Sequence, residues 1–306
     1  MNCQKQKGLT LRRGFTIIEL LVVIAIIVVI VSMLTPALGR AFRSARSAED
    51  TTQAKGIHAS MLLYSTTSDG KLPRPSEIGK GYVDASGDST LIHDIYDTTA
   101  NLMSFMLAQK YFNTEYLISP TEANPNVQDI NEIDLVYDFE SIDGETVLWD
   151  NAFAADISSA TPANLVNNSY AHQALCGERV RLKWHAGASA SDIIISNRGP
   201  ETTITSDGIM SVDENSYTLQ FHGADNTWSG VVVGGDGSSR VANSLYPDGV
   251  AYKPLNGLPL GPDNIFYTDW NDINISSAPL GMASGDNWLV ICNDVYSENE
   301  ISAVWD

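Results

Sequence analysis

The sequence has few basic residues for its length. Of its 306 residues, 18 are Lys or Arg and 37 are Asp or Glu, so the formal net charge is −19. Seven of the bases and a single acid lie in residues 1–46, which carry +6, and the rest of the chain therefore carries −25. Because an acidic surface of this size repels phosphate, we expect no binding of nucleic acid.

Cysteine is also scarce. The chain has three cysteines and no C-x-x-C pair, which excludes a zinc ribbon and a thioredoxin-type redox site. Cys3 lies in the basic N-terminal region, so Cys176 and Cys292 are the pair that an oxidising compartment could join in a disulfide. Two separate buried thiols are the alternative.

The motifs of common enzyme classes are missing. Gly234-Gly235-Asp236-Gly237 lacks the Lys-Ser/Thr of a phosphate-binding loop, and the segment 187–191 lacks the last glycine of a hydrolase elbow. The five histidines show no H-E-x-x-H or other paired spacing. We therefore expect a protein that is not an enzyme.

What the sequence does contain is one long apolar segment near its N-terminus. Leu20–Val31 is twelve apolar residues without a break. As a helix, Phe15–Leu34 would be about 30 Å long, the thickness of a bilayer core. The Lys and Arg ahead of it place its start in the cytoplasm, although three Arg also follow it. The segment predicts a single membrane-spanning helix.

A carboxylate lies near the start of this segment. Glu19 is the one charged residue between Arg13 and Arg40. Because a charge at the centre of a membrane helix costs about 2.5–3.5 kcal/mol, such a residue usually has a partner and a function. A glutamate hydrated at the membrane interface is the alternative.

The run Arg12-Arg13-Gly14-Phe15-Thr16-Ile17-Ile18-Glu19-Leu20-Leu21-Val22-Val23-Ile24-Ala25-Ile26-Ile27 resembles the N-terminal signature of type IV pilins and type II secretion pseudopilins. The resemblance implies cleavage between Gly14 and Phe15 by a prepilin peptidase and methylation of the new amine of Phe15. It implies a single-pass protein of the inner membrane, with its body in the periplasm or on the cell surface. It further implies assembly with other pilin or pseudopilin subunits, on an inner-membrane platform, into a pilus or a secretion pseudopilus.

The resemblance also gives roles to two residues of the helix. Glu19 would pair with the amine of Phe15 of a neighbouring subunit inside the apolar bundle, and this pair would set the axial register. Pro36 lies where many family members carry a proline, and it should kink or locally melt the helix.

The pattern of the whole chain predicts an α+β fold, with a long N-terminal helix packed on an antiparallel sheet body, as in pilins. Apolar residues at helical spacing extend the first helix from Phe15 to about Thr66. We divide the chain into a leader (1–14), a membrane and stem helix (15–67) and an α+β body (68–306). In the body we expect a short helix over Ala100–Phe112, strands over Asp192–Ser196, Tyr217–His222, Trp228–Val233 and Arg240–Ala242, and a tight turn at 234–237 that makes the last three strands a meander.

Parts of the body are similar to a large pseudopilin-like group. Tyr64–Pro73 is similar to that group's stem exit, and Asn197-Arg198-Gly199-Pro200 resembles its Arg-x-Pro turn. His222 followed by Asp236-Gly237 resembles its C-terminal signature, but the 13 residues between His222 and Asp236 are a wider spacing than that group has. We expect the hairpin there and no specific role for His222.

One loop near the C-terminus is rich in oxygen ligands. Acids and amides crowd residues 263–274, and hard oxygen ligands on a flexible loop suit Ca²⁺. Major pseudopilins hold Ca²⁺ in a C-terminal loop, so the resemblance points the same way. Asp263, Asp269 and Asp272 are the candidate ligands, with a solvated acidic turn as the alternative, and we expect no other cofactor.

The large body leaves a second hypothesis open. It is larger than a minimal pseudopilin needs, so the chain could instead be a displayed adhesin or carbohydrate-binding module. A platform for sugars could be formed by some of the six tryptophans, although most tryptophans are core residues. They are Trp149, Trp184, Trp228, Trp270, Trp288 and Trp305.

Overall fold

The computed structural model describes residues 15–78, 96–129, 149, 153–204, 210–224, 226–252, 261–268, 286–297 and 300–305. The chain divides into two compact units, Met1–Ala45 and Arg46–Asp306. The boundary falls inside the first helix rather than after it, because the second half of that helix belongs to the core of the larger unit.

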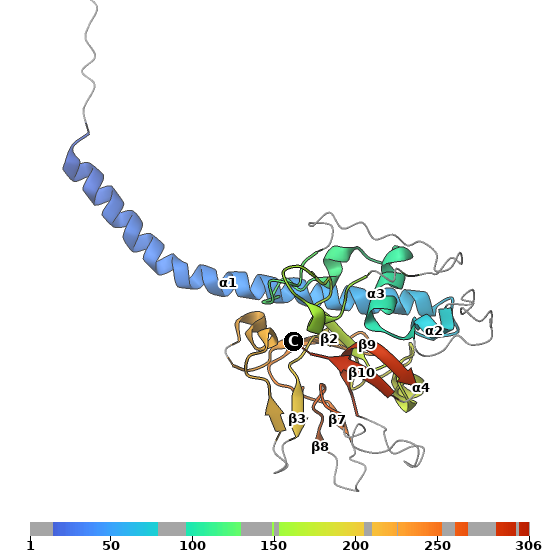
Figure 1. Ribbon diagram of the computed structural model, residues 1–306. Coiled ribbons are helices and arrows are strands. Elements are labelled where there is room, and N and C mark those ends of the chain that lie inside the picture. Colours follow the sequence, from blue (N-terminus) through green and yellow to red (C-terminus); the bar gives the residue numbers. More distant parts are fainter. Residues whose placement is uncertain are drawn as a thin grey trace, which may run out of the picture. The chain divides into compact units, whose positions relative to one another are not determined.

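The long N-terminal helix is confirmed. Helix α1 spans Ile17–Ser65 and contains a stretch long and apolar enough to cross a membrane (Figure 1). Its C-terminal end is closed at Gly70, which has φ 78° and whose amide donates to the Ser65 carbonyl. The helix continues through Pro36, so the expected local melting does not occur there, and a kink stays a prediction.

In the smaller unit, helix α1 exposes its apolar side chains. The large apolar residues from Phe15 to Phe42 have 45% to 84% of their surface exposed. A helix that is apolar on all sides and exposed on all sides needs an apolar environment from outside the chain.

The larger unit is built on one six-stranded sheet with the order β10-β9-β1-β2-β5-β6. All neighbouring strands are antiparallel, which confirms the expected sheet type. The strands are β1 (Tyr170–Gln173), β2 (Ile193–Asn197), β5 (Gly230–Gly234), β6 (Ser239–Ala242), β9 (Leu289–Ser297) and β10 (Glu300–Val304).

Two small sheets and several short helices complete the described part of this unit. The small sheets pair β3 (Thr202–Ile204) with β4 (Met210–Val212), and β7 (Ala251–Tyr252) with β8 (Gly261–Pro262). The helices are α2 (Pro75–Ile78), α3 (Thr99–Ala108), α4 (Glu178–Lys183), η2 (Thr114–Leu117), η4 (Ile157–Ser159) and η5 (Tyr217–Gly223).

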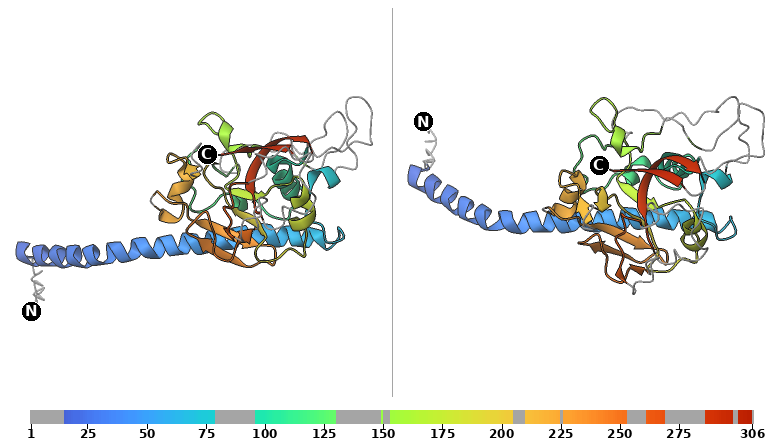
Figure 2. Two further views of the ribbon diagram at one scale, coloured as in Figure 1. Left: turned by 90° about the horizontal axis from the view of Figure 1, so that it is seen from below. Right: turned by 60° about the horizontal axis from the view of Figure 1, so that its bottom comes forward.

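The sheet is buried on both faces. On one face, Ile57 and Met61 of α1 share a core with Val231 and Val233 of β5, and Figure 2 shows this part of α1 running along the sheet. On the other face, Val232 packs in a core with Trp228, Phe266 and Leu219. This alternation follows the period of two in a strand and fixes the register of β5.

Three of the four predicted strands are confirmed, as β2, β5 and β6, with the tight turn between the last two. The prediction for Tyr217–His222 is wrong, because this segment is the 3₁₀ helix η5, and β5 pairs with β2 instead of with it. The Ser216 hydroxyl accepts from the Thr218 amide at the helix start, and the buried Thr218 and Phe221 have the three-residue spacing of a 3₁₀ turn.

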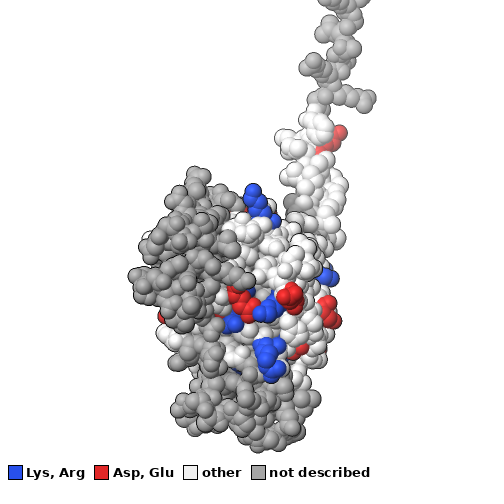
Figure 3. Space-filling view, turned by 90° about the vertical axis from the view of Figure 1, so that its right-hand side faces the viewer, with Lys and Arg blue, Asp and Glu red and all other residues white. Residues whose placement is uncertain are grey.

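Charged side chains of both signs lie next to one another on the face of the molecule drawn in Figure 3. Among the ion pairs of the larger unit, Lys71 and Arg74 both pair with Glu77, and Lys71 Nζ lies 2.8 Å from a Glu77 carboxylate oxygen. Paired exposed charges of this kind contribute little to stability.

Candidate functional site

The first candidate site is the start of helix α1. Glu19 Oε2 accepts hydrogen bonds from the Thr16 amide (2.8 Å) and the Thr16 hydroxyl (2.9 Å), and the Glu19 amide donates to the same hydroxyl (3.2 Å). This reciprocal arrangement is a capping box, which satisfies amide donors at the start of a helix. Within the described residues Glu19 Oε1 accepts no hydrogen bond, so one oxygen is available to a second partner.

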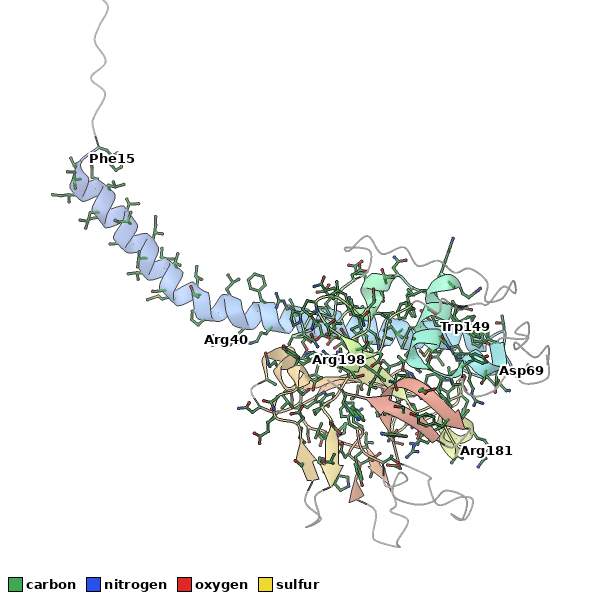
Figure 4. The ribbon with its side chains drawn as sticks, in the orientation of Figure 1. Phe15, Arg40, Asp69, Trp149, Arg181 and Arg198 are labelled. Atoms are coloured by element: carbon green, nitrogen blue, oxygen red, sulfur yellow. The ribbon has the colours of Figure 1, made fainter. Side chains whose placement is uncertain are left out.

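The helix start presents these groups on an apolar segment. Figure 4 shows side chains standing out all around α1 between Phe15 and Arg40. Phe15 is 77% exposed, and Gly14 lies outside the described residues, so the cleavage site stays a prediction.

The second candidate site is the anchor, a buried polar cluster formed by Asp50 of α1 with Tyr170, Asn197 and His222. Asp50 is completely buried. Its Oδ1 accepts from the Tyr170 hydroxyl (2.5 Å) and the Asn197 side-chain amide (3.2 Å), and its Oδ2 lies 2.9 Å from His222 Nε2. A buried carboxylate is tolerated only with such partners, so these contacts fix the position of helix α1 on the strands and turns that supply them.

The backbone places His222 for this contact. His222 has φ 55°, a left-handed conformation that ends the 3₁₀ turn and aims the ring at helix α1. The expectation of no specific role for His222 is therefore corrected: it joins η5 to α1 through Asp50. Within the described part of the chain its other ring nitrogen is buried without a hydrogen bond.

Sequence reasoning did not single out Asp50, although a signal for it exists. Asp50 precedes Ala54, Ile57 and Met61 at helical spacing, and all four are buried on one side of α1. A carboxylate in the apolar stripe of an amphipathic helix has to find partners in the core. That position, rather than any motif, could have identified it.

A buried ion pair adjoins the anchor. Arg198, which follows Asn197, bonds Glu122, and the Ser169 hydroxyl donates to the other Glu122 oxygen at 2.7 Å. The Arg198 guanidinium also lies 5.2 Å from the centre of the Phe221 ring. The Asn197–Pro200 turn thus carries two side chains that tie β2 to the surrounding elements.

Burial is also the main influence on the protonation of Tyr170 in the anchor. Burial, and next to it the charge of Asp50, raises the pKa of Tyr170 well above its usual range, so Tyr170 stays a proton donor to Asp50.

Cys176 and Cys292, the two cysteines of the body, are free thiols and do not form the disulfide that was one of the two expectations. Cys176 and Cys292 are buried in one apolar cluster with Trp288 and Val290. Burial raises the pKa of both thiols, so they are protonated and unreactive at neutral pH.

The candidate Ca²⁺ ligands are described only in part. Asp263 is buried, and its Oδ2 accepts two hydrogen bonds from Asn287, one from the amide (2.7 Å) and one from the side chain (2.8 Å). Burial, with the charge of Asp286 beside it, raises the pKa of Asp263 to about 7. Asp269 and Asp272 lie outside the described residues, so the Ca²⁺ site stays a prediction. Within the described ranges no group of three or more His, Cys, Asp or Glu is arranged for a metal.

Most of the tryptophans that the structure describes are core residues. Trp149, Trp184, Trp228 and Trp288 are buried, Trp305 is partly exposed, and Trp270 is outside the described ranges. A hollow of about 220 Å³ is lined by residues that include Trp288, Trp305, Phe266, Tyr267, Glu201 and Thr202.

Comparison of the chain with protein-family models, with curated proteins and with solved structures finds no match. The two sites and the exposed apolar helix, which is compatible with a single-pass membrane anchor, are the features of the described chain that bear on its function.

Proposed function

We propose that this protein is a pilin-like structural subunit, cut after Gly14 by a prepilin peptidase and assembled into a type II secretion pseudopilus or a type IV pilus-like filament for protein secretion. The observation that carries the proposal is the exposed apolar first half of α1, with Glu19 as its one carboxylate, in its first turn. The family resemblance of residues 12–27 supports the same conclusion.

The apolar half of α1, here called the stem, needs two environments in turn. Before assembly the bilayer covers it, since its length matches the bilayer core. In a filament, other stems cover it, and the exchange of lipid for protein contacts is driven by packing and polar pairs rather than by the hydrophobic effect. Glu19 gives the packing a register, because its second oxygen can accept from the amine that cleavage creates at Phe15 of a neighbour.

The anchor joins the filament core to the displayed body. Asp50 lies on α1, while its partners lie on β1, β2 and η5, so a displacement of α1 would be passed directly to the sheet. The protein performs no chemistry in this proposal. It supplies a rod whose growth moves a cargo or extends a fibre.

The proposal is tested on the protein recovered from its own cells. We expect an intact mass that corresponds to a chain starting at methylated Phe15, and a strong loss of filaments and secretion for Glu19→Ala. Glu214→Ala, at an exposed acid of the larger unit, is the matched control and should change neither. A chain cut after the apolar run, or normal filaments from Glu19→Ala, would overturn the proposal.

The hollow beside Trp305 supports a second candidate function, a displayed carbohydrate-binding module. Aromatic side chains with nearby polar groups are the usual lining of a sugar site. If the full chain in detergent binds a glycan and Trp305→Ala removes that binding, display is favoured over secretion. Absence of binding on a broad glycan panel would remove this candidate.

A further inference from the structure

A groove of about 690 Å³ opens on the larger unit beside helix α1. Its lining combines apolar side chains, such as Ile118 and Val127, with four acids and no Lys or Arg. The acids are Glu49, Glu115, Glu122 and Asp129.

Two of these acids have no side-chain partner among the described residues. Glu122 is bound to Arg198, whereas the side chains of Glu49 and Glu115 are exposed and make no ion pair or hydrogen bond with the residues that the structure describes. A groove of mixed apolar and acidic lining, with the exposed carboxylates of Glu49 and Glu115 on it, fits a partner that is both apolar and basic.

The chain itself carries such a segment. Arg40, Arg43 and Arg46 are all exposed on α1 at a spacing of three residues, with Phe42 exposed between them. In the described part of the chain none of the three arginines forms a salt bridge. They are three of the 18 Lys and Arg in the whole protein. Arg46 precedes Glu49 by three residues, the spacing of a helix-surface pair, yet the described structure has no ion pair between them; Arg40, about 13 Å of helix from Glu49, is out of its reach.

We propose that this groove receives the Arg40–Arg46 segment of a second copy of the chain. The proposal rests on the proposed filament, because it requires parallel stems. It gives the groove a partner, whereas contacts between the apolar stems alone would leave the groove without one.

The register that the proposed pairing of Phe15 with Glu19 would set supports the same assignment. If the amine of Phe15 in one copy lies level with Glu19 of the next, the two copies are shifted by four residues, or about 6 Å. The same shift places Arg46 of the first copy level with Asp50 of the second, next to Glu49 at the edge of the groove. A single axial shift of the two copies therefore allows both the pairing of Phe15 with Glu19 and the pairing of Arg46 with Glu49.

Charge reversal in the full chain, expressed in its own cells, tests the contact. The variants are Arg46→Glu, Glu115→Arg and the two combined, and the measurement is the amount of filament sheared from the cells. Since an exposed ion pair changes an equilibrium by up to about fivefold, we expect each single reversal to lower the yield by about that factor. The combined variant should recover most of it. Lys55→Glu on α1 and Glu214→Arg on the body, both exposed and outside the groove, are matched controls that should leave the yield unchanged.

A crosslink gives a second, direct readout. Cells that co-express Arg46→Cys and Glu115→Cys chains should form disulfide-linked dimers in filaments, and cells with either variant alone should not. The leader holds Cys3, and the other two cysteines are buried, so the background is low.

The outcomes separate this inference from the proposed function. Single reversals that behave like the controls, or a combined variant no better than the singles, would overturn the groove contact. If methylated Phe15 and the Glu19→Ala defect are still observed, the filament proposal stands alone. If the unaltered chain forms no filament, both fall together.

Discussion

The two units of this protein treat polar and apolar groups in opposite ways. In the smaller unit, large apolar side chains are exposed, and Glu19, the one acid in this part of α1, accepts hydrogen bonds from Thr16. In the larger unit, the apolar side chains are inside, and charges such as Asp50 and Arg198 are buried with partners. The comparison shows that the larger unit supplies partners for buried charges such as Asp50 and Arg198 from its own elements, whereas the apolar surface of the smaller unit is left uncovered by the described chain.

Buried charge pairs are a repeated feature of the larger unit. Besides the anchor, Arg179 bonds Asp286, Lys183 Nζ lies 2.9 Å from Asp192, and Arg74 bonds Asp97. Burial of Asp97 outweighs the nearby Arg74 charge and raises the pKa of that carboxyl to about 6. Such pairs add little net stability, but each is costly to break because one buried charge remains.

The largest expected effect comes from breaking the anchor. Asp50→Ala leaves His222, Tyr170 and Asn197 without their shared acceptor, and we expect the free energy of unfolding to fall by about 3–5 kcal/mol. Glu49→Ala, one residue earlier and exposed, is the matched control, with a change of less than about 0.5 kcal/mol. Chemical denaturation of the full chain in detergent measures both.

A second measurement on the Asp50→Ala variant, its insertion into the membrane, separates the two units. Membrane insertion of the Asp50→Ala chain should be unchanged, because the apolar segment is complete without the anchor. Equal stability of the two variants would show that the anchor does not hold α1 to the sheet.

A glycine-to-alanine change should have opposite effects in the two units. In the larger unit, a Cβ at Gly199 would lie 2.5 Å from the ring of Phe266, which is buried against Trp228, so Gly199→Ala should destabilise by about 1–3 kcal/mol. In the smaller unit, a Cβ at Gly39 meets nothing closer than 4.0 Å, and Gly39→Ala should favour the helix by up to about 1 kcal/mol. Thermal melting and helix content by circular dichroism check the pair. A neutral Gly199→Ala would mean that the turn and Phe266 can move apart.

The smallest expected effect is a pH dependence carried by the buried part of α1. Burial lowers the pKa of His58 to about 4 from its usual value of about 6.5, and its Nε2 has no hydrogen-bond partner among the described residues. The unfolded chain therefore binds the proton more tightly than the folded chain. The contribution of neutral His58 to the free energy of unfolding is therefore complete above about pH 6.5, and it is lost as the pH falls toward 4.

His58→Leu should reduce this loss. Between pH 7.5 and 5.5 we expect the variant to lose about 1 kcal/mol less stability than the unaltered chain. Denaturation at the two pH values measures the difference. His172, whose pKa burial also lowers to about 4, remains in the variant and keeps part of the slope. An unchanged slope would show that His58 is not buried as a neutral group.

Much of the fold follows from local pattern. Helix α1, the hairpin of β5 and β6 and the antiparallel sheet agree with the spacing of apolar residues and with the turn chemistry at Gly237, which has φ 79°. These signals are local, because the period of a helix or strand and the needs of a tight turn are written in neighbouring residues.

The chain's sequence by itself thus determined the apolar stem with Glu19 near its start, the helix that extends it and the strands that alternate clearly. Only the tertiary structure decided that residues 217–223 form a 3₁₀ turn, that His222 meets Asp50, and that Glu49 and Glu115 share one groove. These residues are far apart in the chain. The partner of a buried charge is chosen by how separate elements pack, since its desolvation has to be compensated wherever the fold places a donor.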